Sequence, residues 1–170
     1  MRLKNRSGVT ITVLVITIIV MMIIFGITYS TSMDLLKNSQ KNKMKTMLYM
    51  VESRAEILLD DYLFENDGKT TEEMVAEANA SALATLKGRA SSTSDLSAVG
   101  LSGTTNPDGT VVYRTWEESV LEKQGIDTKN LAKGDYIVVK YNLATGEIDV
   151  ASKKGFSNNG TNIHFLSDFE

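Results

Sequence analysis

Cysteine and histidine, two side chains often used in nucleophilic catalysis and metal binding, are almost absent from this sequence. The 170 residues contain no cysteine and a single histidine, His164. This composition leaves out disulfides, thiolate zinc sites and cysteine nucleophiles. His164 alternates with Ile163 and Phe165, which predicts an outward-pointing side chain on a terminal strand. We therefore predict that the protein is not an enzyme, and we expect no cofactor and no metal site.

One short segment resembles parts of two binding motifs without completing either. Gly68-Lys69-Thr70 matches the end of a phosphate-binding loop, but Leu63 stands where the motif needs its first glycine. A calcium loop centred on Gly68 would place Met74 where the bidentate glutamate belongs. The segment is predicted to be a turn. A looser calcium site among Asp127, Asp135 or the acidic residues of 60–67 stays open.

A peptide bond near the N-terminus is the one position where we expect chemistry. Secretory signal peptides usually have an apolar region of about 7–15 residues that ends in a small-x-small cleavage site. Here the apolar run is longer, and residues 29–32 contain no such site. Gly8 is the only small break between the basic start and the apolar run. A cut after Gly8 would leave Val9 as the first residue and keep the apolar segment in the mature protein.

That apolar segment has the length and composition of a membrane span. Residues 7–33 carry no charge, and 16 of the 21 residues from 9 to 29 are Val, Ile, Leu, Met, Phe or Tyr. About 20 helical residues, at ~1.5 Å each, cross a hydrocarbon core of roughly 30 Å. In lipid the backbone must satisfy its own hydrogen bonds, and threonine hydroxyls can bond to preceding carbonyls. A transmembrane helix is predicted over residues 9–33.

Charges beside the span predict its orientation. Arg2, Lys4 and Arg6 precede it without any acidic residue, which favours a cytoplasmic N-terminus. The lysines that follow the span weaken this bias, but a polar head of about a hundred residues comes after them. We expect a single-pass protein of the cell membrane with an extracellular head.

The residues around the expected cut form a recognisable pattern. Lys4-Asn5-Arg6-Ser7-Gly8 is followed by the aliphatic and threonine-containing run of residues 9–20. Over residues 4–29 the chain resembles type IV pilin-like proteins and pseudopilins, in the form common in Gram-positive anaerobes. The resemblance implies that a prepilin peptidase cuts after Gly8 and methylates the amino group of Val9. It also implies packing with other pilin-like subunits and contact with an assembly machinery.

One position departs from the pattern of this family. Val13 stands where such proteins usually carry a glutamate, at the fifth residue of the mature chain. The resemblance therefore implies a minor or non-standard structural subunit of a type IV pilus or a type II secretion-like pseudopilus. The alternative is a signal-anchored extracellular binding or adhesion module that does not polymerise, located in the cell membrane rather than in a surface filament. Pilus, secretion and competence systems are not distinguished.

Residues 34–64 have the apolar spacing of an amphipathic helix. Apolar residues recur at steps of three and four, with charges between them. The main positions are Met44, Leu48, Val51, Ala55, Leu58 and Tyr62. A continuous helix over residues 9–64 is therefore predicted, with one stripe of its second half packed on the head.

The remaining residues, 65–170, predict a small head. A helix is expected from about residue 70 to 87, a loop over 91–109, a strand over 110–114, and a helix that starts with a Thr115–Glu118 capping box and ends at Gly125. Strands 135–142 and 147–151 should form a hairpin with Lys140 opposite Asp149 and Tyr141 opposite Ile148. The predicted fold class is α+β, a long helix with an antiparallel-sheet head, pilin-like in order.

Net charge bears on possible partners. The formal charge is −3, and removal of the three basic residues of the leader leaves 15 Lys and Arg against 21 Asp and Glu, a charge of −6. Direct nucleic acid binding is not expected from such a chain. The lipid bilayer is the expected partner of the apolar segment.

Overall fold

The computed structural model describes residues 7–80, 85–101, 109–129, 131–158 and 161–169. The chain divides into two compact units, Met1–Lys41 and Asn42–Glu170, and each is described by itself. Helix α1, Ser7–Glu65, contributes residues to both, in agreement with the helix predicted over residues 9–64. The predicted leader lies outside the described residues apart from the backbone of its last two positions, and Arg2, Lys4 and Arg6 lie outside them entirely.

In the first unit, α1 is a regular helix in which threonines bond to the preceding turn. The hydroxyl of Thr17 donates to the carbonyl of Leu14 at 2.8 Å, and that of Thr28 donates to the carbonyl of Ile24 at 2.8 Å. Both bonds agree with the sequence prediction. Among the described residues, no helix has both the length and the apolar character needed to cross a membrane. The span predicted over residues 9–33 includes positions 9, 10, 27, 30 and 31, whose side chains lie outside the described part of the chain.

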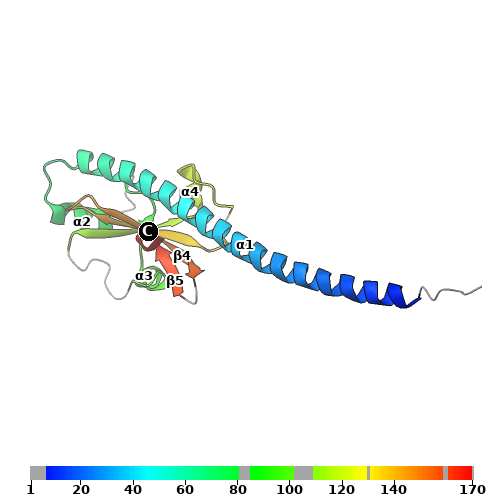
Figure 1. The fold of residues 1–170 in the computed structure, drawn as a ribbon. Helices are drawn as coiled ribbons and strands as arrows, with labels where there is room; N and C mark the ends of the chain where they lie inside the picture. The colour runs from blue at the N-terminus through cyan, green and yellow to red at the C-terminus, as the bar shows by residue number, and fades with distance from the viewer. Residues whose placement is uncertain (1–6, 81–84, 102–108, 130, 159–160, 170) are drawn as a thin grey trace, which may run out of the picture. The chain divides into compact units, whose positions relative to one another are not determined.

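The second unit packs residues 42–65 of α1 with short helices and an antiparallel sheet (Figure 1). The sheet has five strands in the order β1-β2-β3-β4-β5, and each neighbouring pair is antiparallel. The strands are β1 (Arg89–Ala90), β2 (Val111–Glu117), β3 (Tyr136–Asn142), β4 (Ile148–Asn158) and β5 (Thr161–Phe165). The helices beside α1 are α2 (Thr71–Ala80), α3 (Thr93–Ala98), α4 (Glu118–Lys123) and the 3-10 turn η1 (Ser167–Phe169). The predicted α+β class with an antiparallel sheet is confirmed.

The β3–β4 hairpin has the predicted register. Lys140 pairs with Asp149, and Tyr141 pairs with Ile148. The apolar side chains of this face enter the main core, where Ile137, Val139 and Val150 are fully buried. Apolar alternation and one cross-strand charge pair were enough to define this hairpin because a one-residue slip would expose every apolar side chain.

Each face of the sheet is covered. The main core lies between the sheet, α2 and the predicted stripe of α1, in which Leu48, Val51 and Ala55 are fully buried. The second core packs α3 on the opposite face, through Leu96 and Val99 against the sheet. Tertiary packing of the apolar stripe, rather than helix propensity, therefore fixes the second half of α1 in the head.

Three local predictions for the head were wrong. The predicted loop over residues 91–109 contains α3. The predicted helix from 70 to 87 is too long, because Thr85 to Lys87 are not helical and Leu86 is buried in the main core; α2 spans Thr71–Ala80. The predicted Thr115–Glu118 capping box does not form, since β2 continues to Glu117 and α4 begins without a side-chain cap. Pairing of β2 with β3 and full burial of Trp116 outweigh the local capping pattern.

Candidate functional site

The predicted processing residues lie at the start of α1. Gly8 and Val9 have helical backbone in the first turn of the helix, and their side chains are outside the described part of the chain. The topology residues Arg2, Lys4 and Arg6 are not described. The expected chemistry at Gly8–Val9 concerns a backbone bond and the amino group it would release, so it requires no side chain of this chain to react.

Past these residues, α1 presents an apolar surface on all sides. Consecutive large apolar residues are exposed, including Ile11 (65%), Met22 (69%), Phe25 (72%) and Tyr29 (71%). Val13 is 53% exposed. A helix that is apolar all round is typical of segments buried in lipid or among other helices, because one-sided packing needs only one apolar stripe. Most of the exposed large apolar residues in the described part of the chain lie between Ile11 and Leu36.

In the second unit, one flank of α1 carries a straight row of exposed residues. Met50 (43% exposed), Ile57 (48%) and Phe64 (86%) follow at seven-residue steps, which is nearly two helical turns. The exposed Lys43 begins the same row. On this flank Arg54 Nε donates to Gln124 Oε1 at 2.8 Å, so the row lies on the α4 side of α1. A hollow of about 460 Å³ lies beside Met50, lined also by Thr46, Ser53 and Gln124.

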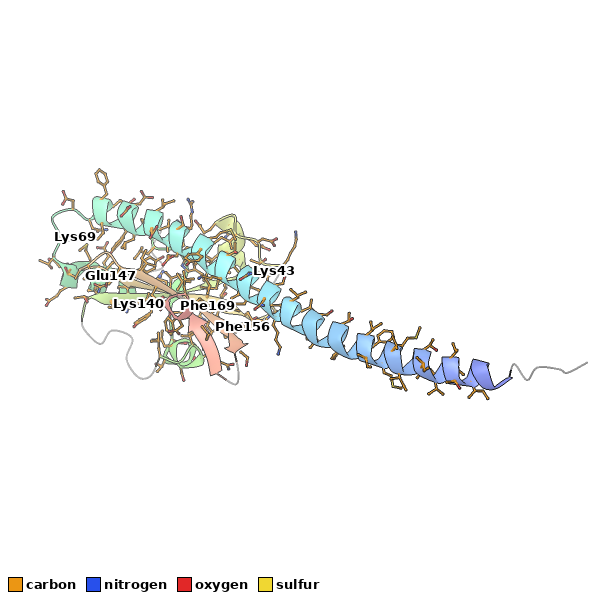
Figure 2. The ribbon with its side chains drawn as sticks, viewed as in Figure 1. Lys43, Lys69, Lys140, Glu147, Phe156 and Phe169 are labelled. Atoms are coloured by element: carbon orange, nitrogen blue, oxygen red, sulfur yellow. The ribbon has the colours of Figure 1, made fainter. Side chains whose placement is uncertain are left out.

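The opposite flank of α1 borders a hollow against the β3–β4 hairpin. Its volume is about 370 Å³, and its lining contains three carboxylates, one lysine and an aromatic ring. The lining residues are Tyr49, Glu52, Lys140, Glu147, Ile148, Asp149, Leu166 and Ser167. Figure 2 labels Lys140 and Glu147 on the hairpin and Lys43 on α1. The acidic excess makes this hollow suited to a cationic group.

Asp149 is a half-buried carboxylate of that hollow. It accepts hydrogen bonds from the backbone N–H of Val150 at 2.9 Å and from Ser167 Oγ at 3.2 Å. Burial raises the pKa of its carboxyl, and the two hydrogen bonds and the nearby Lys140 oppose this shift. A cation that entered the hollow would also lower the pKa, because it favours the charged carboxylate.

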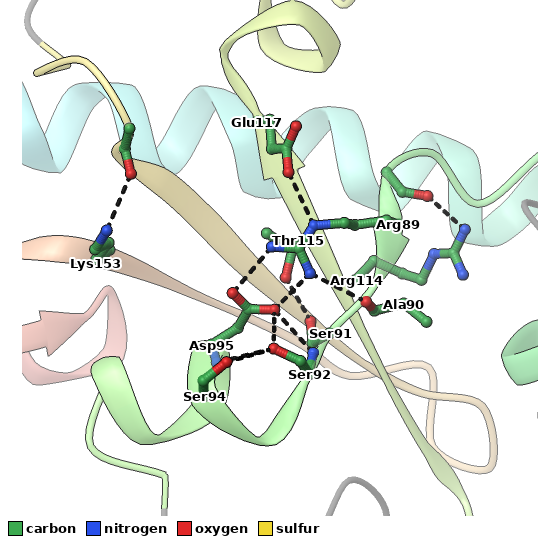
Figure 3. Close-up of polar contacts among 12 residues, drawn as sticks. Arg89, Ala90, Ser91, Ser92, Ser94, Asp95, Arg114, Thr115, Glu117 and Lys153 are labelled. Carbon is green, nitrogen blue, oxygen red and sulfur yellow. Dashed lines mark hydrogen bonds and ion pairs between the residues drawn. The ribbon is translucent and has the colours of Figure 1, made fainter.

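On the other face of the sheet, an ion-pair network holds α3 and β1 to β2 (Figure 3). Arg89 donates to both carboxylate oxygens of Asp95 and to Glu117 Oε1 at 2.8 Å. These hydrogen bonds lower the pKa of Asp95 well below its ordinary value, despite the opposing effect of burial. Asp95 also forms a reciprocal capping box with Ser92 at the start of α3. The network is structural, since its groups bond to one another.

Arg114 is a buried cation that bonds to both sides of the segment after α2. Arg114 is fully buried, and its guanidinium donates to the carbonyls of Ala78 (3.2 Å) and Gly88. Burial lowers the pKa of Arg114. Gly88 has φ +87°, and a Cβ there would lie 2.5 Å from Thr115 O and 2.6 Å from Trp116 Cδ1. Only glycine fits so close to β2.

The remaining sequence candidates have ordinary surroundings. His164 lies on terminal strand β5 as predicted, but its ring is partly buried against Gly155 and its Nδ1 lies 2.9 Å from the carbonyl oxygen of Ser152. Thr70 and Glu73 exchange capping contacts that begin α2, so Gly68-Lys69-Thr70 precedes a helix as a turn. In the described part of the chain, no group of three His, Cys, Asp or Glu side chains is arranged to hold a metal ion.

The sequence did not identify the two flanks of α1, the buried Arg114 or the ion pairs of Arg89. Ser92 followed by Asp95 is a capping-box spacing that could have located α3. The hollow joins residues 49–52 with residues 140–167, and no local pattern connects such distant segments. Comparison of the chain with protein-family models, with curated proteins and with solved structures finds no match.

Proposed function

We propose that the chain is a pilin-like structural subunit of a type IV pilus or a type II secretion-like pseudopilus. In this proposal the chain is inserted with its N-terminus in the cytoplasm, cut after Gly8, methylated at Val9 and held in the cell membrane by residues 9–33. The head, residues 65–170, is presented outside the cell. The role is structural rather than catalytic.

The observation that carries the proposal is the exposed apolar surface of α1 in the first unit. Side chains of residues 11–25, such as Ile11 and Phe25, stay largely exposed, whereas apolar stripe residues of the second unit, such as Leu48, are fully buried. Transfer of apolar area out of water is favourable by about 25 cal/mol per Å². A helix with this surface gains stability by entering lipid and then by packing with helices of other subunits.

The internal packing of the head also supports the proposal. Its two cores are closed around α1 and α3, and the polar networks of Arg89 and Arg114 serve packing. A stable head on an apolar helix suits a subunit whose helix makes the assembly contacts. Gly26, beside which a Cβ would meet nothing within 4 Å, leaves room for a neighbouring helix to approach.

A second candidate function is favoured by Val13. In the proposed family a glutamate at this position would pair with the N-terminal amine of a neighbour, and a valine makes no such pair. The candidate is a signal-anchored binding or adhesion module that stays single in the membrane. It shares the span and the orientation and differs only in whether copies associate.

Two measurements on the protein from its native membrane test these proposals. Intact mass and N-terminal sequencing should give a chain that starts at a methylated Val9. A chain that still starts at Met1 would refute pilin-type processing. Mechanical shearing of cells without detergent should then release a filament that contains the protein, whereas retention of all the protein in the membrane would favour the non-polymerising module.

A further inference from the structure

We propose that α1 docks a second copy of this chain through its two flanks in the second unit: Lys43 and Met50 on one copy pack beside the acidic hollow of the next. This inference rests on the proposed function and names the contact through which copies associate outside the membrane.

The first step is the direction in which the two surfaces point. Lys43 and Glu52 are nine residues apart on α1. At about 100° per residue, nine residues turn the helix by about 900°, so the two side chains leave it on opposite sides. The contacts agree with this geometry, since Met50 lines the hollow on the α4 side and Glu52 lines the one beside the β3–β4 hairpin, with Tyr49 between them lining both.

The second step is charge complementarity. The hollow beside the hairpin contains Glu52, Glu147 and Asp149 against a single lysine, Lys140, so it favours a cationic group. On the opposite flank, Lys43 is exposed at the N-terminal end of the apolar row. A lysine has a long apolar stem and a charged end, so it can lie along Tyr49 and Leu166 while its ammonium reaches the carboxylates.

The third step is the register between copies. Lys43 of one copy meets the hollow of the next when their helices are parallel and shifted by about nine residues, or roughly 14 Å at 1.5 Å per residue. The proposed filament supplies parallel helices, because all of its subunits enter the assembly in one orientation. In this register Met50 of the first copy lies level with residue 59 of the second helix, and Ile57 lies level with residue 66, just past the end of that helix at Glu65. Part of the exposed apolar surface of Met50 is then removed from water.

The fourth step is what this contact builds. The two surfaces differ and lie on opposite flanks, so each copy can bind one neighbour on each side. A contact between unlike surfaces that includes an axial shift does not close into a pair and instead continues as an open helical assembly. The flanks of α1 would therefore be sufficient to set the axial step of a filament.

The absence of cysteine from the chain permits a direct test. We would introduce Lys43→Cys and Glu52→Cys in the same full-length chain, and oxidise it in the native membrane. Within one chain these positions are about 14 Å apart along the helix, so they cannot bridge internally, because a disulfide needs Cα atoms within about 7 Å. We expect a ladder of disulfide-linked multimers, and no ladder from either single variant.

A matched pair of cysteines on one flank serves as the control. Lys43→Cys with Ile57→Cys places both thiols on the same row, so the proposed contact predicts no ladder. Cross-linking of that pair, with none of the opposite-flank pair, would overturn the proposal in favour of a row-to-row contact.

A charge exchange adds a second readout. Lys43→Glu should reduce the amount of filament released by shearing by about tenfold or more, and Lys43→Glu combined with Glu52→Lys should restore much of that amount.

The outcomes separate this contact from the function on which it rests. Filaments released from wild-type cells, together with no ladder from the opposite-flank pair, would overturn the contact and leave the structural role intact. A wild-type protein that releases no filament on shearing would overturn the assembly role and the contact with it. Filaments together with a ladder confined to the opposite-flank pair would support both.

Discussion

Gly88 offers the sharpest test of how the segment after α2 meets the sheet. Replacement of Gly88 by Ala adds one methyl group at φ +87°, 2.5 Å from Thr115 O and 2.6 Å from Trp116 Cδ1. The positive φ costs about 1–2 kcal/mol for any residue with a Cβ. The close approach to backbone adds an overpacking cost of about 1–3 kcal/mol. We therefore expect a loss of roughly 2–5 kcal/mol in the free energy of unfolding.

Gly146→Ala is the matched control for this prediction. Gly146 also has a positive φ, +75°, but a Cβ there would meet nothing within 4 Å. Its loss should be about 1–2 kcal/mol, from the backbone alone. Both substitutions reduce the freedom of the unfolded chain equally, so this effect cancels in the comparison. The difference between the two variants therefore isolates the close approach of Gly88 to β2.

The assay is urea unfolding of the full chain in mild detergent, followed by tryptophan fluorescence. Trp116 is the single tryptophan and is fully buried in the head, so its emission reports on the head and not on the apolar half of α1. Free energies come from linear extrapolation of the transitions. Losses for Gly88→Ala and Gly146→Ala that agree within about 0.5 kcal/mol would refute the packing described for residue 88.

Two further substitutions use the same titration. Leu48→Ala should lower the free energy of unfolding by about 2–5 kcal/mol because it opens a cavity in the main core. Leu36 is 58% exposed, so Leu36→Ala should change that free energy by less than about 0.5 kcal/mol. Equal effects of the two substitutions would contradict the burial of the predicted stripe. Hydrogen bonds from Arg89 lower the pKa of Asp95. The pair therefore stabilises the head at pH values above the ordinary aspartate pKa of about 4, and this stabilisation is lost as the pH falls below about 4. Asp95→Asn should therefore weaken the head at neutral pH and flatten the fall of the urea midpoint toward about pH 3; an unchanged acid dependence would count against the ion pair.

The parts of the fold that could be predicted are those whose signal is local and repeated. The stripe around Leu48 and Val51 defines α1 because an apolar period of 3.6 residues, sustained over several turns, buries one continuous face only in a helix. The hairpin was found with its register because apolar alternation and the Lys140–Asp149 pair agree on a single alignment. Each of these signals lies within a short stretch of sequence.

The parts that could not be predicted depend on distant partners. The end of α2 is fixed by Arg114, whose guanidinium reaches Ala78 and Gly88 from β2. The strand extends through Thr115 because it pairs with β3, although the sequence there resembles a capping box. Of the candidate surfaces, the apolar half of α1 was visible in the sequence. The row from Lys43 to Phe64 was not, since its exposure depends on which flank the sheet leaves uncovered.

The placement of η1 has a consequence for the order in which the head can form. Lys45 Nζ donates to the carbonyl of Phe169 at 3.2 Å across 124 positions of sequence, and the rings of Phe156 and Phe169 lie 6.4 Å apart in the core beside α1. The apolar stripe of α1 is synthesised early, yet its covering strands and this final turn emerge last. Contacts of such long sequence separation slow folding, typically to milliseconds or seconds. The nascent chain therefore exposes this stripe until almost all of the head is available, and that interval is when it is most prone to associate wrongly.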